Sequence, residues 1–143
     1  MSTQFFGHII DNEEVESISG ERFDVWNPWT QEVFAQAAEG GAEDAERAIA
    51  SARKAFDEGP WPRMTHPERA AAIHKLADLM EERADELATL DSTNMAKPFA
   101  QAKHDVGRSV ANFRFFADHQ RDHTGEVYPM PSGHHTYSEF GPA

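Results

Sequence analysis

The first forty residues contain short runs in which apolar and polar residues alternate, the two-residue period of half-buried strands. Residues 9–38 are therefore predicted to form β-hairpins. One hairpin turns at Asp11 and Asn12, and the other turns at residues 27–30, where a proline restricts φ to a turn conformation. Gly20 is predicted to mark the turn between them.

After residue 40 the apolar residues repeat at helical spacing, which predicts three helices over residues 42–57, 66–92 and 98–122. Thr65 and Glu68 fit a capping box at the start of the second helix. The apolar stripe of the first helix is mostly alanine, so close packing against a flat neighbour is expected. The members of that stripe are Ala45, Ala48, Ile49, Ala52 and Phe56.

The third predicted helix carries two distinct faces. One is an apolar stripe suited to a core. The other combines His104, Arg108, Ala111 and Phe115, whose spacing places them along one side of the helix. A helix with one apolar face and one mixed cationic and aromatic face often contacts something besides its own core. This second face is therefore a candidate site.

Two further strand-like runs, EVYPM and HHTYSEF, flank residues 131–133 and predict a β-ribbon over residues 126–143. The predicted fold of the chain itself is therefore α+β, with N-terminal β-hairpins, three helices and a C-terminal β-ribbon. No internal repeat and no low-complexity tract interrupts this order.

The composition is that of a chain that can fold and that carries a strongly negative charge. The 143 residues are 39% hydrophobic and 27% charged, and 25 Asp and Glu against 13 Lys and Arg give a formal net charge of −12. Such a charge repels phosphate backbones and anionic membranes, so neither nucleic acid nor a membrane is expected as a partner. No signal peptide or membrane-length apolar run is seen, and a cytoplasmic location is predicted.

The sequence lacks the complete motifs of several reaction classes. It contains no cysteine, which excludes disulfides, cysteine-bound zinc and a cysteine nucleophile within this chain. It also contains no G-x-G-x-x-G, phosphate-binding loop, G-x-S-x-G or H-E-x-x-H, and its only close glycine pair is Gly40 and Gly41. No catalytic or cofactor-binding residue is predicted.

His119 and His123 are the best local metal candidates, because a four-residue spacing places two imidazoles on one helix face. A metal site usually needs three or four ligands, and no third ligand is identifiable. The favoured interpretation is a solvated helix end, where a histidine suits the helix dipole. No metal site is predicted.

Arg108 is the candidate for ligand binding on the mixed face of the third helix. A guanidinium group binds a carboxylate through two parallel hydrogen bonds, and the aromatic run NFRFF begins one turn later. From the pattern alone, an ordinary exposed arginine is the competing interpretation.

Several separate segments, in order, resemble the N-terminal region of the NAD(P)-dependent aldehyde dehydrogenase superfamily. The resemblance extends from about residue 9 to the end of the chain. NFRFFADH is most similar to the dehydrogenases of hydroxymuconic semialdehydes, including 5-carboxymethyl-2-hydroxymuconate semialdehyde. The segments are SGERFDVWNPWTQEVFAQAAEG, AIASARKAFDEGPWPRMTHPERA, LADLMEERADELATLDSTNMAKP and NFRFFADHQRDHTGEVYPM.

The resemblance implies an α/β parent fold with a Rossmann-like cofactor domain, to which residues 1–125 would contribute hairpins and helices. Residues 126–143 would begin an oligomerisation ribbon that is truncated here. The parent enzyme would use NAD or NADP to oxidise an aldehyde to an acid, as a homo-oligomer. Its nucleophilic cysteine, general base and cofactor-binding glycines would follow later, so these 143 residues alone are expected to bind no cofactor and to be inactive.

In this resemblance Arg108 falls where the third helix reaches the mouth of the substrate tunnel. Muconic semialdehydes carry carboxylates, so Arg108 is predicted to bind a substrate carboxylate. The alternative to an enzyme segment is an independent interaction module that docks on intact subunits by strand addition. A small metal-binding protein that uses His119 and His123 ranks below both.

Three positions depart from the family pattern, since Asn12, Gln31 and Ala96 stand where glycine is common. If these turns require a positive φ, Asn tolerates it best, whereas Gln and Ala would be strained by about 1 kcal/mol each. Asn94 stands where the family often has Asp near a structural monovalent cation, which leaves that site undecided.

Overall fold

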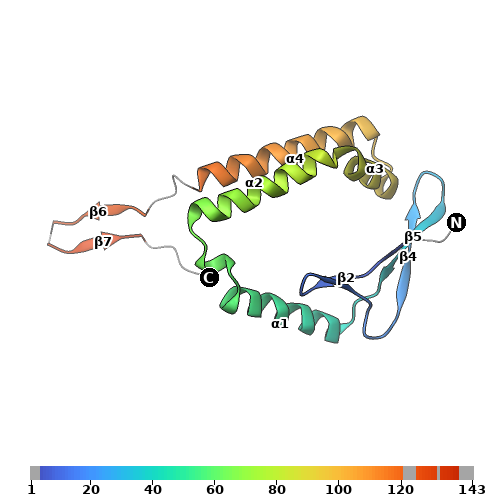
Figure 1. The fold of residues 1–143 in the computed structure, drawn as a ribbon, viewed down its shortest axis with the longest axis horizontal. Coiled ribbons are helices and arrows are strands. Elements are labelled where there is room, and N and C mark those ends of the chain that lie inside the picture. The colour runs from blue at the N-terminus through green and yellow to red at the C-terminus, as the bar shows by residue number, and fades with distance from the viewer. Residues whose placement is uncertain (1–3, 121–124, 132, 139–143) are drawn as a thin grey trace.

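The computed structural model describes residues 4–120, 125–131 and 133–138 as an open arrangement of helices, small sheets and a projecting ribbon (Figure 1). Helices α2 and α4 lie side by side, α3 packs against α4 at one end, and α1 lies apart from them beside β2. The elements are β1 Gln4–Phe6, β2 His8–Ile10, β3 Glu13–Val15, β4 Arg22–Asn27, β5 Glu32–Ala38, α1 Ala42–Glu58, the 3-10 turn η1 Trp61–Arg63, α2 His66–Glu82, α3 Ala84–Met95, α4 Phe99–His119, β6 Val127–Pro129 and β7 His135–Tyr137.

The two predicted hairpins are confirmed, and a further strand joins them. β2 and β3 pair antiparallel across Asp11 and Asn12, and β4 and β5 pair antiparallel across residues 28–31. β1 lies parallel to β5, with Gln4 opposite Ala35, which gives a sheet in the order β1-β5-β4. The prediction of residues 9–38 missed β1, because a strand of three residues is too short to display a two-residue period.

The α+β class is confirmed, but the predicted helix 66–92 is wrong because it is two helices. α2 and α3 meet at Arg83, whose φ of −103° and ψ of 20° lie outside the α-helical region. The Arg83 guanidinium donates to the Glu86 carboxylate at 2.8 and 2.6 Å, on the first turn of α3. The pattern hides this break, because buried Ala77 and Ala88 continue the apolar stripe across it without Gly or Pro. The described residues therefore form four α-helices instead of three.

The start of α2 is capped as the sequence predicts. The Glu68 carboxylate accepts a hydrogen bond from the Thr65 backbone N–H at 2.7 Å, and the Glu68 N–H donates to the Thr65 hydroxyl at 3.4 Å. These bonds satisfy backbone donors that the helix itself leaves free. The bond from the Thr65 N–H, followed by that from its hydroxyl, lowers the pKa of Glu68.

The core follows the seam between α2 and α4 and is built mainly from alanine. Ala70 and Ala77 of α2, together with Ala102 and Ala117 of α4, are completely buried. Side chains this small let the two helix backbones approach closely. Val110 of α4 completes the seam with 4% of its surface exposed.

Charged pairs close the edges of this seam. The Arg114 guanidinium of α4 donates to Asp78 and Glu81 of α2, at 2.7 Å in each case. Further along, His74 Nε2 of α2 lies 2.9 Å from the Asp118 carboxylate of α4. These contacts hold α4 at two points along its length, so its rotation about its own axis is determined.

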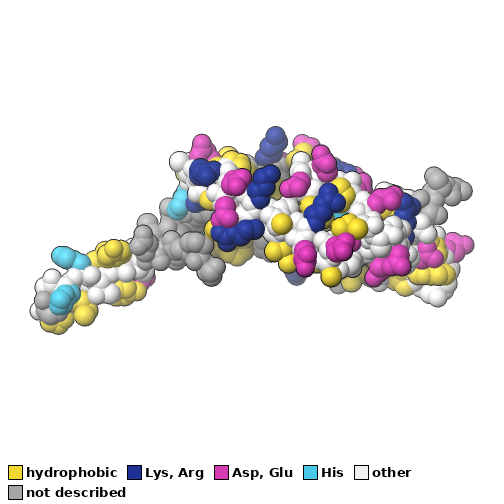
Figure 2. All heavy atoms as spheres, turned by 90° about the horizontal axis from the view of Figure 1, so that it is seen from below, with side chains coloured by type: hydrophobic (Ala, Val, Ile, Leu, Met, Phe, Trp, Pro, Cys, Tyr) yellow, Lys and Arg dark blue, Asp and Glu magenta, His cyan; other side chains and the backbone are white. Residues whose placement is uncertain are grey.

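Helix α1 leaves its apolar stripe uncovered by the rest of the described chain. Ile49 is 68% exposed and Phe56 is 45% exposed, and the expected flat neighbour is absent among the described residues. The helix is held instead at its N-terminus, where the Asp44 carboxylate accepts hydrogen bonds from the Ser17 hydroxyl and the Ile18 N–H at 3.1 and 3.0 Å. Figure 2 shows hydrophobic side chains interspersed among charged ones on the face that it presents.

The strands β6 and β7 form the predicted ribbon, which projects away from the helices (Figure 1). Val127 pairs with Tyr137 in antiparallel register, and every residue of both strands is exposed. Gly133 has a φ of 73°, as a turn between the strands requires. Ser132, residues 139–143 and the predicted end of the third helix at residue 122 lie outside the described residues. None of the described helices combines the length and the apolar character of a membrane-spanning segment.

The suspected positive φ values are confirmed at all three positions. Asn12, Gln31 and Ala96 have φ values of 64°, 59° and 54°. Ala96 immediately follows α3 in the left-handed conformation that usually ends a helix at glycine. Asp11 has a φ of 54° as well, which the sequence did not indicate.

Ala96→Gly is expected to stabilise the chain by about 1 kcal/mol, because glycine adopts a left-handed φ without the steric cost that alanine carries. The free energy of unfolding in urea, compared between the chain and the variant, measures this change. Gln31→Gly serves as a second case with the same backbone conformation, and Ala96→Val should act in the opposite direction. A loss of stability in Ala96→Gly would contradict the assignment of strain.

Candidate functional site

Helix α4 turns one side away from its packing partners, and this side is the candidate site. Because Ala102, Val110 and Ala117 face the seam, the residues on the opposite side of the helix face outward. We call these residues the outer face of α4. They are His104, Arg108, Ala111 and Phe115, and all four are exposed.

Arg108 has one acidic neighbour on its own helix surface, Asp105. The positions three and four residues away on the same helix carry His104, Asp105, Ala111 and Asn112, of which only Asp105 is an acid. Asp105 is turned away, since its carboxylate lies 3.0 Å from the ammonium group of Lys97. Among the residues that the structure describes, none accepts a hydrogen bond from the Arg108 guanidinium.

Lys97 holds Asp105 as part of a half-buried ionic cluster between α3 and α4. Its ammonium group also lies 2.8 Å from the Asp91 carboxylate, and the Ser92 hydroxyl donates to the Lys97 carbonyl at 2.7 Å. Hydrogen bonds to Asp91 and Asp105 raise the pKa of Lys97. The hydrogen bond from Lys97 lowers the pKa of Asp105, and the positive charges of Lys97, Arg108 and His104 lower it further.

Aromatic rings continue the outer face toward the end of α4. The Phe115 ring lies edge-on to Phe116 with 5.3 Å between centroids, and it stacks on His119 with 5.9 Å between centroids. Phe115 keeps 61% of its surface exposed. The outer face therefore carries a guanidinium group and, two turns further along the same side of the helix, an exposed aromatic ring.

The predicted metal candidates are not tested as a pair, because His123 lies outside the described residues. His119 is described and contacts the Phe115 ring. Within the described ranges, no group of three or more His, Asp or Glu side chains is arranged to hold a metal ion. Asn94 lines an apolar cleft of about 340 Å³ with Phe6, Phe34 and Leu90.

Helix N-termini are the usual phosphate sites in nucleotide-binding proteins, so the start of α1 tests whether this chain fits a dinucleotide. The Gly41 N–H donates to the Asp44 carboxylate at 3.0 Å, and the same carboxylate accepts from Ser17 and Ile18. These bonds lower the pKa of Asp44, those from the Gly41 and Ile18 N–H groups most of all. The N–H groups of Gly41 and Ile18 are therefore already bonded to the Asp44 carboxylate.

A cleft of about 580 Å³ lies where α2, α3 and α4 meet. Four of its charged side chains pair with one another, since Lys103 lies 2.6 Å from Asp85 and Arg114 lies 2.7 Å from Glu81. We therefore regard this cleft as a junction between helices and not as a binding site.

Sequence reasoning found Arg108 but missed the role of Lys97. Asp91 and Asp105 belong to different helices, and Lys97 lies in the short loop between them. No helical period links the three residues, so the cluster becomes visible only once α3 folds back onto α4. The one available signal was a lysine immediately before the proline that starts a helix.

Comparisons with known proteins agree on one group of enzymes. A sequence profile of the Aldehyde dehydrogenase family matches residues 15–143. Benzaldehyde dehydrogenase, mitochondrial, of Antirrhinum majus is 38% identical over 143 residues, which are 99% of this chain and 27% of that protein. Aldehyde dehydrogenase 1 of Tanacetum cinerariifolium is 42% identical over 130 residues, which are 90% of this chain and 26% of that protein.

Solved structures show the same similarity in three dimensions. The NAD+ complex of aldehyde dehydrogenase from Bacillus cereus matches with a TM-score of 0.88 at 37% identity, covering 94% of this chain and 28% of that chain. NAD-dependent aldehyde dehydrogenase from Sinorhizobium meliloti matches with a TM-score of 0.84 at 35% identity, covering 89% and 26%. The chain thus spans 27% and 26% of the length of the two curated relatives above.

Asp105→Asn is expected to lower the melting temperature at neutral pH, because Lys97 loses one of its two carboxylate partners. In the folded chain the pKa of Asp105 is held below its ordinary value of 3.8, so ionised Asp105 stabilises the fold at pH values above 3.8. This stabilisation is lost as the pH falls through the pKa that Asp105 has in the folded state. The difference between the chain and the variant should therefore shrink below pH 3.8. Thermal unfolding at about pH 7 and about pH 3 measures both differences.

Asp85→Asn is the matched control, because it breaks the more exposed pair with Lys103 and should change the melting temperature little. Equal losses in the two variants would contradict a special role for the Lys97 cluster. So would a difference for Asp105→Asn that persists unchanged at the lower pH.

Proposed function

The chain belongs to the aldehyde dehydrogenase family, and we propose that it is the N-terminal segment of an enzyme that oxidises an aldehyde to a carboxylic acid with NAD or NADP. Relatives described as NAD-dependent, or solved with NAD+, support this reaction. The segment itself has no cysteine to attack the aldehyde, and its α1 N-terminus is filled by Asp44. The proposal assigns the chemistry and the cofactor to residues outside these 143.

We further propose a division of the segment between two parts of that enzyme. Residues 1–125 contribute to the cofactor-binding domain, and residues 126–143 begin the oligomerisation ribbon. The uncovered apolar stripe of α1 supports the first assignment, because so much exposed apolar surface normally contacts another part of a protein. The projecting, fully exposed strands β6 and β7 support the second, because their free edges can pair with neighbouring strands.

The proposed substrate is an aldehyde that carries a carboxylate, of the muconic semialdehyde class formed in aromatic degradation. One observation carries this part, namely that Arg108 is exposed on the outer face of α4 while its acidic neighbour Asp105 is bound to Lys97. The guanidinium is therefore available for an external carboxylate. Phe115 supplies an apolar surface on the same side of the helix for the unsaturated chain.

The independent interaction module is not favoured over the enzyme segment. Similarity to aldehyde dehydrogenases extends over nearly the whole chain, including the helices that a docking ribbon alone would not need. A cytoplasmic location stays a prediction, and the relatives include a mitochondrial protein.

In the full-length enzyme, Arg108→Ala should reduce kcat/KM for the carboxylated semialdehyde by roughly 10- to 150-fold. This range corresponds to the 1.5–3 kcal/mol of a hydrogen bond to a charged group. The value for a neutral aldehyde of similar size should stay within about threefold, because that substrate has no group for the guanidinium to bind. Steady-state kinetics on both substrates provide the measurement.

Lys103→Ala is the matched control for the loss of one positive charge on α4, since Lys103 is already paired with Asp85. It should affect both substrates alike. Equal losses on the two aldehydes in Arg108→Ala, or an equal loss of preference in Lys103→Ala, would exclude Arg108 as the carboxylate contact.

The purified 143-residue chain is expected to show only background reduction of NAD or NADP with the semialdehyde. It contains no cysteine thiolate to form the covalent intermediate, and the Gly41 N–H at the start of α1 already donates to Asp44. The absorbance of the reduced cofactor measures this rate, and the full-length enzyme is the positive control. Substrate-dependent cofactor reduction by the chain alone would contradict the proposal that catalysis and cofactor binding depend on residues outside these 143.

A further inference from the structure

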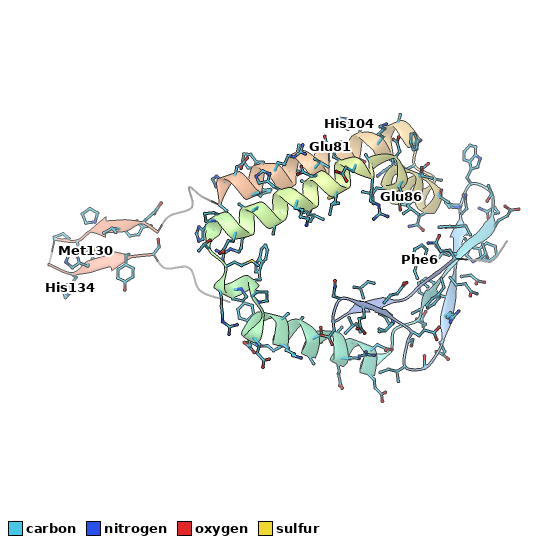
Figure 3. The ribbon with its side chains drawn as sticks, in the orientation of Figure 1. Phe6, Glu81, Glu86, His104, Met130 and His134 are labelled. Carbon is cyan, nitrogen blue, oxygen red and sulfur yellow. The ribbon has the colours of Figure 1, made fainter. Side chains whose placement is uncertain are left out.

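The outer face of α4 carries a second ionisable group beside Arg108. His104 is exposed and lies one helical turn before Arg108, where side chains are about 5–6 Å apart at Cβ. Figure 3 shows His104 on α4, at the edge of the helix away from the interior of the molecule. A ligand that approaches this face can therefore contact both the imidazole and the guanidinium.

Helix geometry brings the two groups toward the same point. Side chains in an α-helix lean toward the N-terminus, so the guanidinium of Arg108 extends over the turn that carries His104. A carboxylate has two oxygens and about four lone-pair sites, and a bidentate guanidinium leaves at least one of them free. A protonated imidazole beside the guanidinium can donate to that oxygen.

The carboxylates around α4 that form ion pairs do so with cations other than His104 and Arg108. The ion pairs around α4 either join it to α2 and α3 or belong to the Lys97 cluster in the loop before it. Asp105 is next to His104 in the chain, and besides the hydrogen bond from Lys97 the charge of His104 contributes to the lowered pKa of Asp105. Within the described ranges these contacts leave no carboxylate bonded to His104. They are Asp78 and Glu81 with Arg114, Asp118 with His74, Asp85 with Lys103, and Asp91 and Asp105 with Lys97.

We propose that His104 is a second contact for the substrate carboxylate and that it acts when its imidazole is protonated. The proposal rests on the carboxylated substrate proposed above. Arg108 stays charged at every pH of interest and provides the constant part of the attraction. Histidine side chains gain a proton between about pH 8 and 5, where a carboxylate stays ionised, so His104 makes the preference for the charged substrate increase as the pH falls.

The anion and the proton favour one another at this position. A carboxylate bound between the two groups can accept hydrogen bonds from the guanidinium and from the protonated imidazole. Binding of the carboxylated substrate should therefore be linked to uptake of a proton.

The test uses the full-length enzyme and the ratio of kcat/KM for the carboxylated semialdehyde to kcat/KM for a neutral aldehyde. The ratio cancels titrations of the chemical step that both substrates share. In the unaltered enzyme it should be about tenfold higher at about pH 6 than at about pH 8.5, as expected for one charge-assisted hydrogen bond. In His104→Gln the ratio should no longer vary with pH and should stay at the value that the unaltered enzyme has at high pH. In His104→Lys it should also be constant, at the value that the unaltered enzyme has at low pH.

The melting temperature of each full-length variant reports whether it is folded. A ratio that does not vary with pH in the unaltered enzyme overturns the inference, and so does an unchanged pH dependence in His104→Gln. Arg108→Ala separates the two proposals. If Arg108→Ala lowers the ratio while His104→Gln leaves its pH dependence intact, only the role of His104 fails; if Arg108→Ala leaves the ratio unchanged, the proposed substrate class fails.

Discussion

The close packing of α2 against α4 is the constraint on which the rest of the structure depends. Completely buried alanines allow the two backbones to approach, and Arg114 fixes the rotation of α4 by binding Asp78 and Glu81. Once one side of α4 is committed in this way, the residues half a turn away must face outward. The exposure of Arg108 is therefore a consequence of small side chains on the opposite side of its own helix.

The sequence predicts those features that depend on local pattern or local chemistry. The hairpin turns, the capping box at Thr65 and the unusual φ of Ala96 all follow from a few neighbouring residues. The break at Arg83 could not be predicted, because the apolar period continues through it. The expectation that α1 packs against a flat neighbour within the described chain failed for a different reason. An apolar stripe predicts that a helix packs against something, but it does not identify the residues that cover it.

In the candidate site, too, some features could be predicted from local spacing and others could not. Helical spacing alone placed His104, Arg108 and Phe115 on one face, and the structure confirms that this face is exposed. The availability of Arg108 could not be read from spacing, because Asp105 is near enough to pair with it. That outcome depends on Lys97, which reaches Asp105 only after the loop between α3 and α4 has folded.

The pairing of elements has a consequence for how the chain folds. β2 joins β3, β4 joins β5, α3 joins α4 and β6 joins β7, and each of these pairs is close in the sequence. Contacts of this kind close short loops and form quickly. The parallel pairing of β1 with β5, and the ion pairs of Arg114 with Asp78 and of His74 with Asp118, which are 36 and 44 residues apart, must close longer loops. The seam between α2 and α4 is therefore expected to form after the hairpins. The apolar stripe of α1 stays in contact with water at every step of this order, so this helix is where self-association of the chain is expected to begin.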